Sequence, residues 1–163
     1  MRKVYITNLI PDLASKMLKK KGFGVAVNES GRPLRREDLL KVLASYDAVL
    51  SSVVDKIDDE ALGQSSANLK IIANYAVGFD NIDVLAAKRR GIVVTNTPGV
   101  AGEAVAEHTF ALILACKKRL LEADRYVRVG KFRNFEALLF VSPQLWGKTI
   151  GIVGLGRIGT YVG

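Results

Sequence analysis

The stretch KTIGIVGLGRIG, residues 148–159, decides how the fold of this chain is assigned. Residues 148–153 form a short apolar run rich in β-branched side chains, which predicts a buried β-strand. Gly154 to Gly159 follows at once as a complete G-x-G-x-x-G. A strand that runs directly into this motif favours a dinucleotide-binding turn, with a glycine-rich turn that binds nothing as the alternative.

Each glycine of the motif has a physical task in such a turn. Gly154 would make the tight turn, Gly156 would let a pyrophosphate approach bare backbone, and Gly159 would let the next helix lie close to the strand. The start of that helix would offer unpaired N–H groups to the phosphates. The acidic ribose ligand, expected about 20 residues further on, lies beyond Gly163, so we expect a Rossmann domain truncated after the glycine-rich loop.

Upstream of the motif, short apolar runs alternate with segments of helical character. The predicted strands are residues 4–7, 23–27, 47–51, 69–73 and 92–95. Pro11 and Asp58 fit helix starts between them, and Gly22 and Gly91 fit helix ends. Continuous apolar strands that alternate with helices are typical of a parallel α/β sheet covered on both faces. We therefore expect residues 1–99 to form one domain.

A long helix is predicted after the linker at 96–99, over residues 101–121. Apolar side chains cover much of its circumference, so we expect it to be buried on more than one side, with Cys116 as an inert buried thiol. Residues 122–129 either continue this helix or form a second piece ended by Gly130. Residues 131–144 have no clear period and predict a structured loop or arm.

The composition is that of a soluble globular protein. The 163 residues are 49% apolar and 25% charged, and no apolar run reaches the length of about 20 residues that a membrane span needs. A single cysteine excludes an internal disulfide and fits a reducing compartment, and no secretory h-region follows Met1. We therefore expect a cytoplasmic protein with no membrane partner.

The net charge of +8 raises the question of nucleic-acid binding. The excess lysine and arginine is spread over helix ends and one loop near the N-terminus, with no interleaved aromatic residues and no recognition motif. A solvated basic surface is the favoured interpretation, and we expect no nucleic-acid partner.

Four segments of the sequence carry a resemblance to a known family. They are LKIIANYAVGFDNID (69–83), RGIVVTNTPGV (90–100), AEHT (106–109) and GKTIGIVGLGRIG (147–159). Together they resemble the D-isomer-specific 2-hydroxyacid dehydrogenases and, within that family, the glyoxylate reductases. The resemblance covers the whole chain, which corresponds to roughly the first half of a family member.

This resemblance implies a division of the chain into two domains. Residues 1–99 would be the N-terminal part of a flavodoxin-like, parallel-sheet substrate domain, which a C-terminal segment completes in full-length members. Residues 100–163 would be the long helix and the truncated start of the Rossmann NAD(P)-binding domain. In the family this long helix crosses over and contributes to a homodimer interface.

The resemblance also implies where a small 2-oxoacid or 2-hydroxyacid binds. Its carboxylate would be held by the backbone amides of Val77 and Gly78. Fixed N–H donors suit an anion and Gly78 allows close approach of the backbone, whereas a plain glycine turn is the alternative. Ser52 falls where many glyoxylate reductases carry an apolar pocket residue, and it is the third expected substrate-binding residue.

For the cofactor, NAD or NADP, the resemblance points to the glycine-rich loop. The expected cofactor-binding residues are Gly154, Leu155, Gly156, Arg157, Ile158 and Gly159. Arg157 would add charge-assisted bonds to phosphate, with a solvent-facing arginine as the alternative. Val105 would lie near the nicotinamide side, at a position that often carries threonine in relatives.

The family's reaction is hydride transfer between NAD(P)H and a small 2-oxoacid such as glyoxylate or hydroxypyruvate. Its arginine, glutamate and histidine follow the point at which this sequence ends, so no catalytic residue and no metal ligand is assigned here. His108, the single histidine, is expected to be a packed or surface residue of the long helix. We expect this chain alone to be inactive; the alternatives are a non-catalytic dimerising fragment and one half of a split enzyme.

Overall fold

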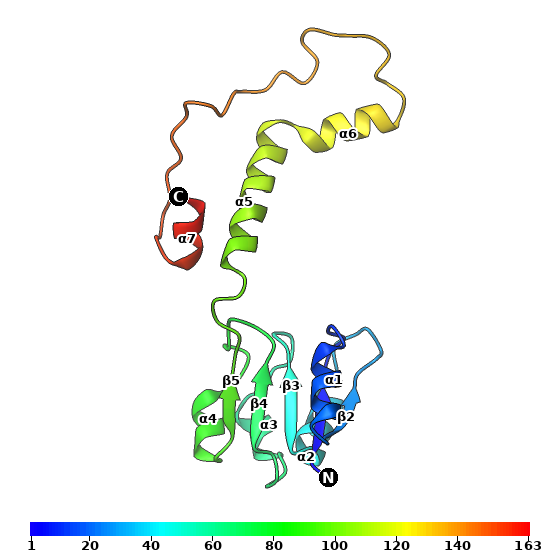
Figure 1. Cartoon of the computed structure of the whole chain (residues 1–163), viewed down its shortest axis with the longest axis vertical. Helices are drawn as coiled ribbons and strands as arrows, with labels where there is room; N and C mark the ends of the chain where they lie inside the picture. The colour runs from blue at the N-terminus through cyan, green and yellow to red at the C-terminus, as the bar shows by residue number, and fades with distance from the viewer. The chain divides into compact units, whose positions relative to one another are not determined.

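The computed structural model describes residues 1–163, and the chain folds into two compact units, Met1–Pro98 and Gly99–Gly163. The first unit is a parallel sheet with helices, and the second consists of helices joined by irregular chain (Figure 1). The assignment of a substrate role to residues 1–99 and of a cofactor role to residues 100–163 stays a prediction.

The strands of the sheet all belong to the first unit and all run parallel. They are β1 (Lys3–Ile6), β2 (Gly24–Val27), β3 (Ala48–Ser51), β4 (Ile71–Asn74) and β5 (Val93–Thr95). Their order, β2-β1-β3-β4-β5, is flavodoxin-like, with a change of direction between β1 and β3. The predicted fold class is confirmed, and the strands match those predicted apart from residues at their ends.

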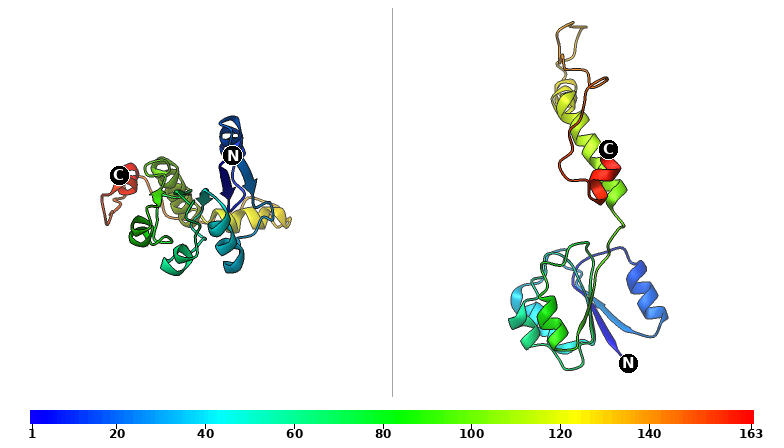
Figure 2. Two further views of the ribbon diagram at one scale, coloured as in Figure 1. Left: turned by 90° about the horizontal axis from the view of Figure 1, so that it is seen from below. Right: turned by 90° about the vertical axis from the view of Figure 1, so that its left-hand side faces the viewer.

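Helices cover the two faces of this sheet unequally. Helix α1 (Leu13–Lys20) lies on one face, and α2 (Arg36–Ser45), α3 (Asp59–Gly63) and α4 (Val84–Arg89) lie on the other (Figure 2). Right-handed crossovers explain this, because β2 lies on one side of β1 while β3, β4 and β5 lie on the other.

The main core lies between the sheet and the face that carries α2, α3 and α4. Its innermost large side chains, at most 1% exposed, are Leu43, Ile57, Leu62, Leu69 and Ile72. Tyr5 of β1 packs on the same side. Since side chains alternate along a strand, the buried Val4 and Ile6 lie on the face that carries α1.

The helix ends follow the capping residues in the sequence. The Asp58 carboxylate accepts a hydrogen bond of 3.0 Å from the Ala61 amide at the start of α3. Arg36 donates to the same carboxylate at 2.6 Å, and this bond lowers the pKa of Asp58 below its usual value. Gly22 and Gly91, with φ of 81° and 68°, end α1 and α4 in the left-handed region. The helix boundaries predicted at Asp58, Gly22 and Gly91 are confirmed, whereas Pro11 precedes the N-cap residue Asp12 of α1 and lies outside its first turn.

The second unit contains two helices where one long helix was predicted over 101–121. They are α5 (Gly102–Lys117) and α6 (Leu120–Arg128), and α7 (Arg157–Val162) follows the irregular chain. Arg119 between α5 and α6 has a left-handed φ of 53°, which breaks the helix. The alternative of a second helical piece is therefore confirmed, and Gly130, with φ of 72°, ends it as predicted.

The burial predicted for this helical region is wrong. Ala106 is the only buried residue of α5, and Phe110, Leu112 and Leu114 are 44%, 53% and 44% exposed. Cys116 is exposed rather than buried. An apolar pattern around a helix says that several sides suit burial, but it does not say which element covers them.

The strand predicted at 148–153 is also absent. The segment is irregular, and Ile150 and Val153 are exposed. A strand needs a neighbour with which to form its ladder of hydrogen bonds, and the five strands of the structure all lie in the first unit. The apolar pattern of this segment suits a strand, but it does not specify the neighbouring strand with which the segment would have to pair.

The core of the first unit makes a direct prediction for stability. Ile72→Ala removes a fully buried side chain and should lower the free energy of unfolding by about 2–5 kcal/mol, measured by urea denaturation followed by circular dichroism. Leu85→Ala, at a position that is 71% exposed, is the matched control and should change it by less than about 0.5 kcal/mol. Equal effects of the two substitutions would contradict the described core.

Candidate functional site

Small polar residues gather where the parallel strands of the first unit end. Thr7 follows β1, Ser51 and Asn74 end β3 and β4, and Asn96 follows β5. Parallel strands share one carboxyl edge, and in open α/β sheets this edge is where ligands bind. Thr7, Ser51 and Asn74 are almost completely buried, so their polar atoms must be hydrogen-bonded within the protein.

A buried carboxylate organises the β1–β3 part of this edge. Asp55 is 2% exposed and accepts hydrogen bonds of 2.5 Å from the Thr7 hydroxyl and 2.8 Å from the Ser52 amide. The Ser52 hydroxyl in turn accepts a bond of 2.7 Å from the Asn8 side-chain amide. Ser52 is therefore held in place by Asn8, which follows β1, and by Asp55 in the loop that follows β3.

Two asparagines connect Ser52 to the turn after β4. The Asn81 side-chain amide donates to the carbonyl oxygens of Ser52 and Asp55, each at 3.0 Å. The Asn74 side-chain amide donates to the Gly78 carbonyl at 2.9 Å and to the Asn81 side-chain oxygen at 3.1 Å. The structure thus brings Ser52, Val77 and Gly78, the predicted substrate-binding residues, to one edge of the sheet.

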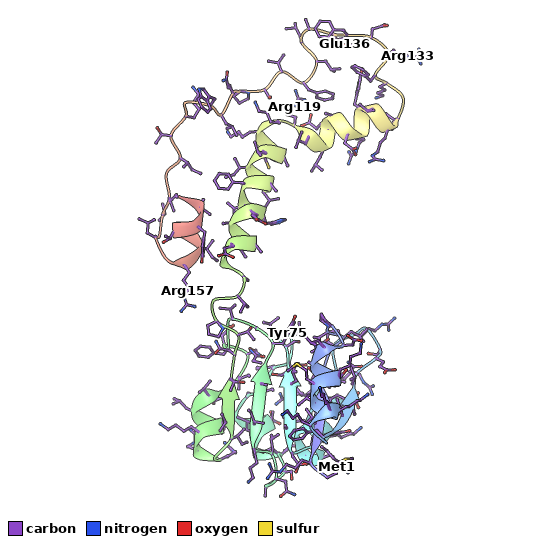
Figure 3. All side chains as sticks on the ribbon, in the orientation of Figure 1. Met1, Tyr75, Arg119, Arg133, Glu136 and Arg157 are labelled. Atoms are coloured by element: carbon purple, nitrogen blue, oxygen red, sulfur yellow. The ribbon has the colours of Figure 1, made fainter.

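The turn itself presents its amides rather than its carbonyls. It begins at Tyr75, at the edge where the strands end (Figure 3). The carbonyls of Ala76 and Val77 accept bonds of 2.8 Å and 2.7 Å from the Thr97 amide and the Asn96 side chain. The main-chain amides of Val77 and Gly78 donate to no atom of the chain, and both residues are exposed. Two adjacent N–H groups are therefore free to bind an acceptor.

The backbone conformation of Gly78 does not require glycine, but the space beside it favours a residue without a side chain. Its φ lies outside the left-handed region in which glycine is favoured. A β-carbon placed on Gly78 would lie 3.2 Å from an oxygen of Asp80, which is tighter than ordinary contact. A side chain at this position would crowd Asp80 and stand beside the free amides.

The three glycines of the loop in the second unit differ in their backbone conformation and in the space around them. Gly154 has a left-handed φ of 97°, as a tight turn requires. A β-carbon on Gly159 would overlap the Gly154 carbonyl oxygen, whereas one on Gly156 would meet no atom within 4 Å. Gly156 is exposed at the N-cap of α7, with open space where a side chain would be.

The other predicted cofactor residues lie around this loop. Leu155 is 76% exposed, Ile158 is 46% exposed, and Arg157 extends from the start of α7 (Figure 3). The ring of Tyr161 in α7 fills the space beside Gly102, which packs α7 against the first turn of α5. Val105, 40% exposed, lies one turn further along α5, so the structure brings it to the same part of the unit.

The single histidine and the acidic side chains form no metal site. His108 is exposed on α5. No group of three or more histidine, cysteine, aspartate or glutamate side chains is arranged to hold a metal ion. None of the helices has the length and apolar character needed to cross a bilayer.

Sequence reasoning missed the asparagines that shape the turn. Asn74 and Asn96 donate to carbonyls of the turn, and Asn81 joins Asn74 to the Ser52 carbonyl. None of the three was among the predicted site residues. A signal was present, because Asn74 and Asn96 each stand where an apolar strand ends. Polar residues at that position of parallel strands point to the ligand-binding edge.

The family model described as "D-isomer specific 2-hydroxyacid dehydrogenase, catalytic domain" matches residues 4–151. The chain belongs to this family. The glyoxylate reductase of Thermofilum pendens is 48% identical over 159 residues, which are 96% of this chain and 46% of that protein. The glyoxylate reductase of Pyrococcus furiosus is 45% identical over 98% of this chain and 48% of its own length. The chain spans about half the length of the curated relatives it matches.

Solved structures agree with this 2-hydroxyacid dehydrogenase assignment. The crystal structure of the TT0316 protein from Thermus thermophilus has a TM-score of 0.93 and 39% identity, over 98% of this chain and 51% of that one. D-lactate dehydrogenase from Aquifex aeolicus, solved with NAD and lactic acid, has a TM-score of 0.74 and 30% identity, over 99% of this chain and 46% of its own.

Proposed function

We propose that the protein to which this chain belongs transfers a hydride between NAD(P)H and a small 2-oxoacid such as glyoxylate or hydroxypyruvate. Membership of the 2-hydroxyacid dehydrogenase family supports the reaction class. The observation that carries the proposal is the turn after β4, whose Val77 and Gly78 amides are unpaired while its carbonyls are bonded.

In this proposal the Val77–Gly78 turn binds the substrate carboxylate. An ionised carboxylate only accepts hydrogen bonds, so its site needs N–H donors that point toward the ligand and are held in that direction. Hydrogen bonds to a charged acceptor are about twice as strong as neutral ones, which suits a small ligand with few contacts. Ser52, bonded through Asn81 to the same network, would line the substrate side of the turn.

We propose that the glycine-rich loop of residues 154–159 holds NAD or NADP. The open space at Gly156 fits a pyrophosphate against bare backbone, and Arg157 would add a charged donor. Leu155 and Ile158 would flank the pyrophosphate, and Val105 would lie toward the nicotinamide. The cofactor supplies the hydride when bound. The relative from Aquifex aeolicus, solved with NAD and lactic acid, supports this pairing of ligands.

These assignments make residues 1–99 the substrate part and residues 100–163 the beginning of the cofactor part. The single cysteine supports a reducing compartment, so we place the protein in the cytoplasm. The family's catalytic arginine, glutamate and histidine are assigned to no residue of this chain. Binding, rather than turnover, is therefore the test that residues 1–163 allow.

We also propose that the second unit contributes to a homodimer. Phe110, Leu112 and Leu114 of α5 are about half exposed, and Phe135 and Leu138 of the segment that follows α6 are 88% and 86% exposed. Apolar surface of this kind marks interaction sites. The same observation favours the second candidate function, a non-catalytic dimerising fragment or one half of a split enzyme.

The carboxylate site predicts a selective response to ligand in a ¹H–¹⁵N correlation spectrum of residues 1–163. Adding glycolate should shift the amides of Val77 and Gly78, because these N–H groups become hydrogen-bonded to a charged acceptor. Glycolamide, the neutral analogue of the same size, should shift them much less. Unmoved Val77 and Gly78 amides at saturating glycolate would refute the proposed substrate site.

The cofactor site predicts that Gly156→Ala folds normally but loses NADH binding. Its β-carbon would enter open space in the protein, so the free chain should keep its spectrum, while the methyl group would exclude the pyrophosphate. Titration should show NADH-dependent shifts at residues 155–158 in the wild type but not in the variant. Gly151→Ala, which also meets no atom within 4 Å, is the matched control. An NADH response in Gly156→Ala equal to that of the control would contradict the assignment.

The dimer proposal predicts a mass that depends on concentration. Light scattering should show dimers of residues 1–163 at high concentration, and Leu112→Lys should shift them to monomers because it places a charge on the apolar surface of α5. Leu85→Lys, at an exposed position of α4, is the control and should leave the mass unchanged. A wild-type chain that stays monomeric at every concentration argues against the dimer.

A further inference from the structure

The carbonyls of three consecutive residues in the turn each accept a hydrogen bond from a different donor. The Ala76 carbonyl accepts from the Thr97 amide at 2.8 Å, and the Val77 carbonyl from the Asn96 side chain at 2.7 Å. The Gly78 carbonyl accepts from the Asn74 side chain at 2.9 Å. Two of the three donors are thus asparagine side chains, one from β4 and one from the end of β5.

Because the peptide group is planar, a hydrogen bond that fixes a carbonyl also fixes the direction of the N–H in the same peptide. In a trans peptide the C=O of one residue and the N–H of the next point in opposite directions, and the chain contains no cis peptide bond. Holding the Val77 carbonyl toward Asn96 therefore turns the Gly78 N–H away from Asn96. In the same way, Thr97 sets the direction of the Val77 N–H, and Asn74 sets that of the Phe79 N–H.

The two asparagines differ in how firmly they are held. Asn74 is 2% exposed, and its side-chain oxygen accepts a bond of 3.1 Å from the Ser51 hydroxyl, so both ends of its amide are used. Asn96 is partly exposed, and its bond to the Val77 carbonyl is the only one its side chain makes. A substitution at Asn96 therefore removes one hydrogen bond and leaves the buried network intact.

We propose that Asn96 is a positioning residue, which sets the Gly78 N–H of the carboxylate site through the Val77 carbonyl without needing to touch the ligand. Asn74 has the same relation to the next peptide, because its bond to the Gly78 carbonyl sets the direction of the Phe79 N–H. The amide of Phe79 donates to no atom of the chain. This inference rests on the proposed carboxylate site.

Substitutions at Asn96 test the proposal by ligand affinity and by the spectrum of the free chain. Asn96→Ala removes the donor, and Asn96→Leu removes it while keeping a side chain of similar size. Each should weaken glycolate binding roughly tenfold or more, the loss expected for a misplaced donor to a charged acceptor. Without ligand, each should shift the Gly78 amide more than the Val77 amide, because the Thr97 bond to the Ala76 carbonyl remains.

Asn68→Ala is the matched control, because Asn68 is an exposed residue before β4, at the opposite edge of the sheet. It should leave both the affinity and the Gly78 amide unchanged, and all three variants should keep a cooperative urea transition, which shows that they fold. If both Asn96 variants bind glycolate as the wild type does, Asn96 has no positioning role while the carboxylate site stands. If the wild-type chain itself does not bind glycolate, the proposed site fails, and the role of Asn96 fails with it.

Discussion

The hydrogen bonds that take up the carbonyls of the turn after β4 are the constraint on which the proposed site depends. A short turn that leaves β4 has as many carbonyls as amides, and either set could face solvent. Donors from β4 and from the end of β5 bind the carbonyls of Ala76, Val77 and Gly78, so the amides remain for a ligand. A ligand with acceptors only, such as a carboxylate, suits this arrangement.

The parallel sheet makes that constraint possible. The order β2-β1-β3-β4-β5 places the ends of β1, β3, β4 and β5 along one edge, so donors that are far apart in sequence reach the same turn. The core on the side of α2, α3 and α4, with residues such as Leu43 and Ile72 fully buried, holds the strands in register beneath this edge. Sites supported by packed elements keep a more exact geometry than sites on free loops.

Sequence patterns predicted those features whose cause is local. Period and composition located the five strands of the sheet, and single residues such as Asp58 and Gly22 marked helix ends. The prediction of a strand at 148–153 is wrong. A strand must pair with a neighbouring strand, and the residues of the segment do not specify one. Cys116 is exposed for a related reason: an apolar pattern shows suitability for burial without naming what covers it.

The site was predictable in part. The resemblance pointed to Val77 and Gly78, and their roles stay predictions, as do those of the glycine-rich loop. The position of Asn96 after β5 marks it as a residue of this edge, but its partner, the Val77 carbonyl, lies 19 residues earlier in the chain, in the turn after β4. Only the sheet brings the two together, so no local pattern carries that contact.

A crystal structure of residues 1–163 grown with oxamate would test the central claim most directly. We expect the oxamate carboxylate to lie about 3 Å from the main-chain nitrogens of Val77 and Gly78, with Asn96 still bonded to the Val77 carbonyl. A carboxylate bound elsewhere, or Val77 and Gly78 amides that donate to carbonyls of the protein itself, would contradict the account.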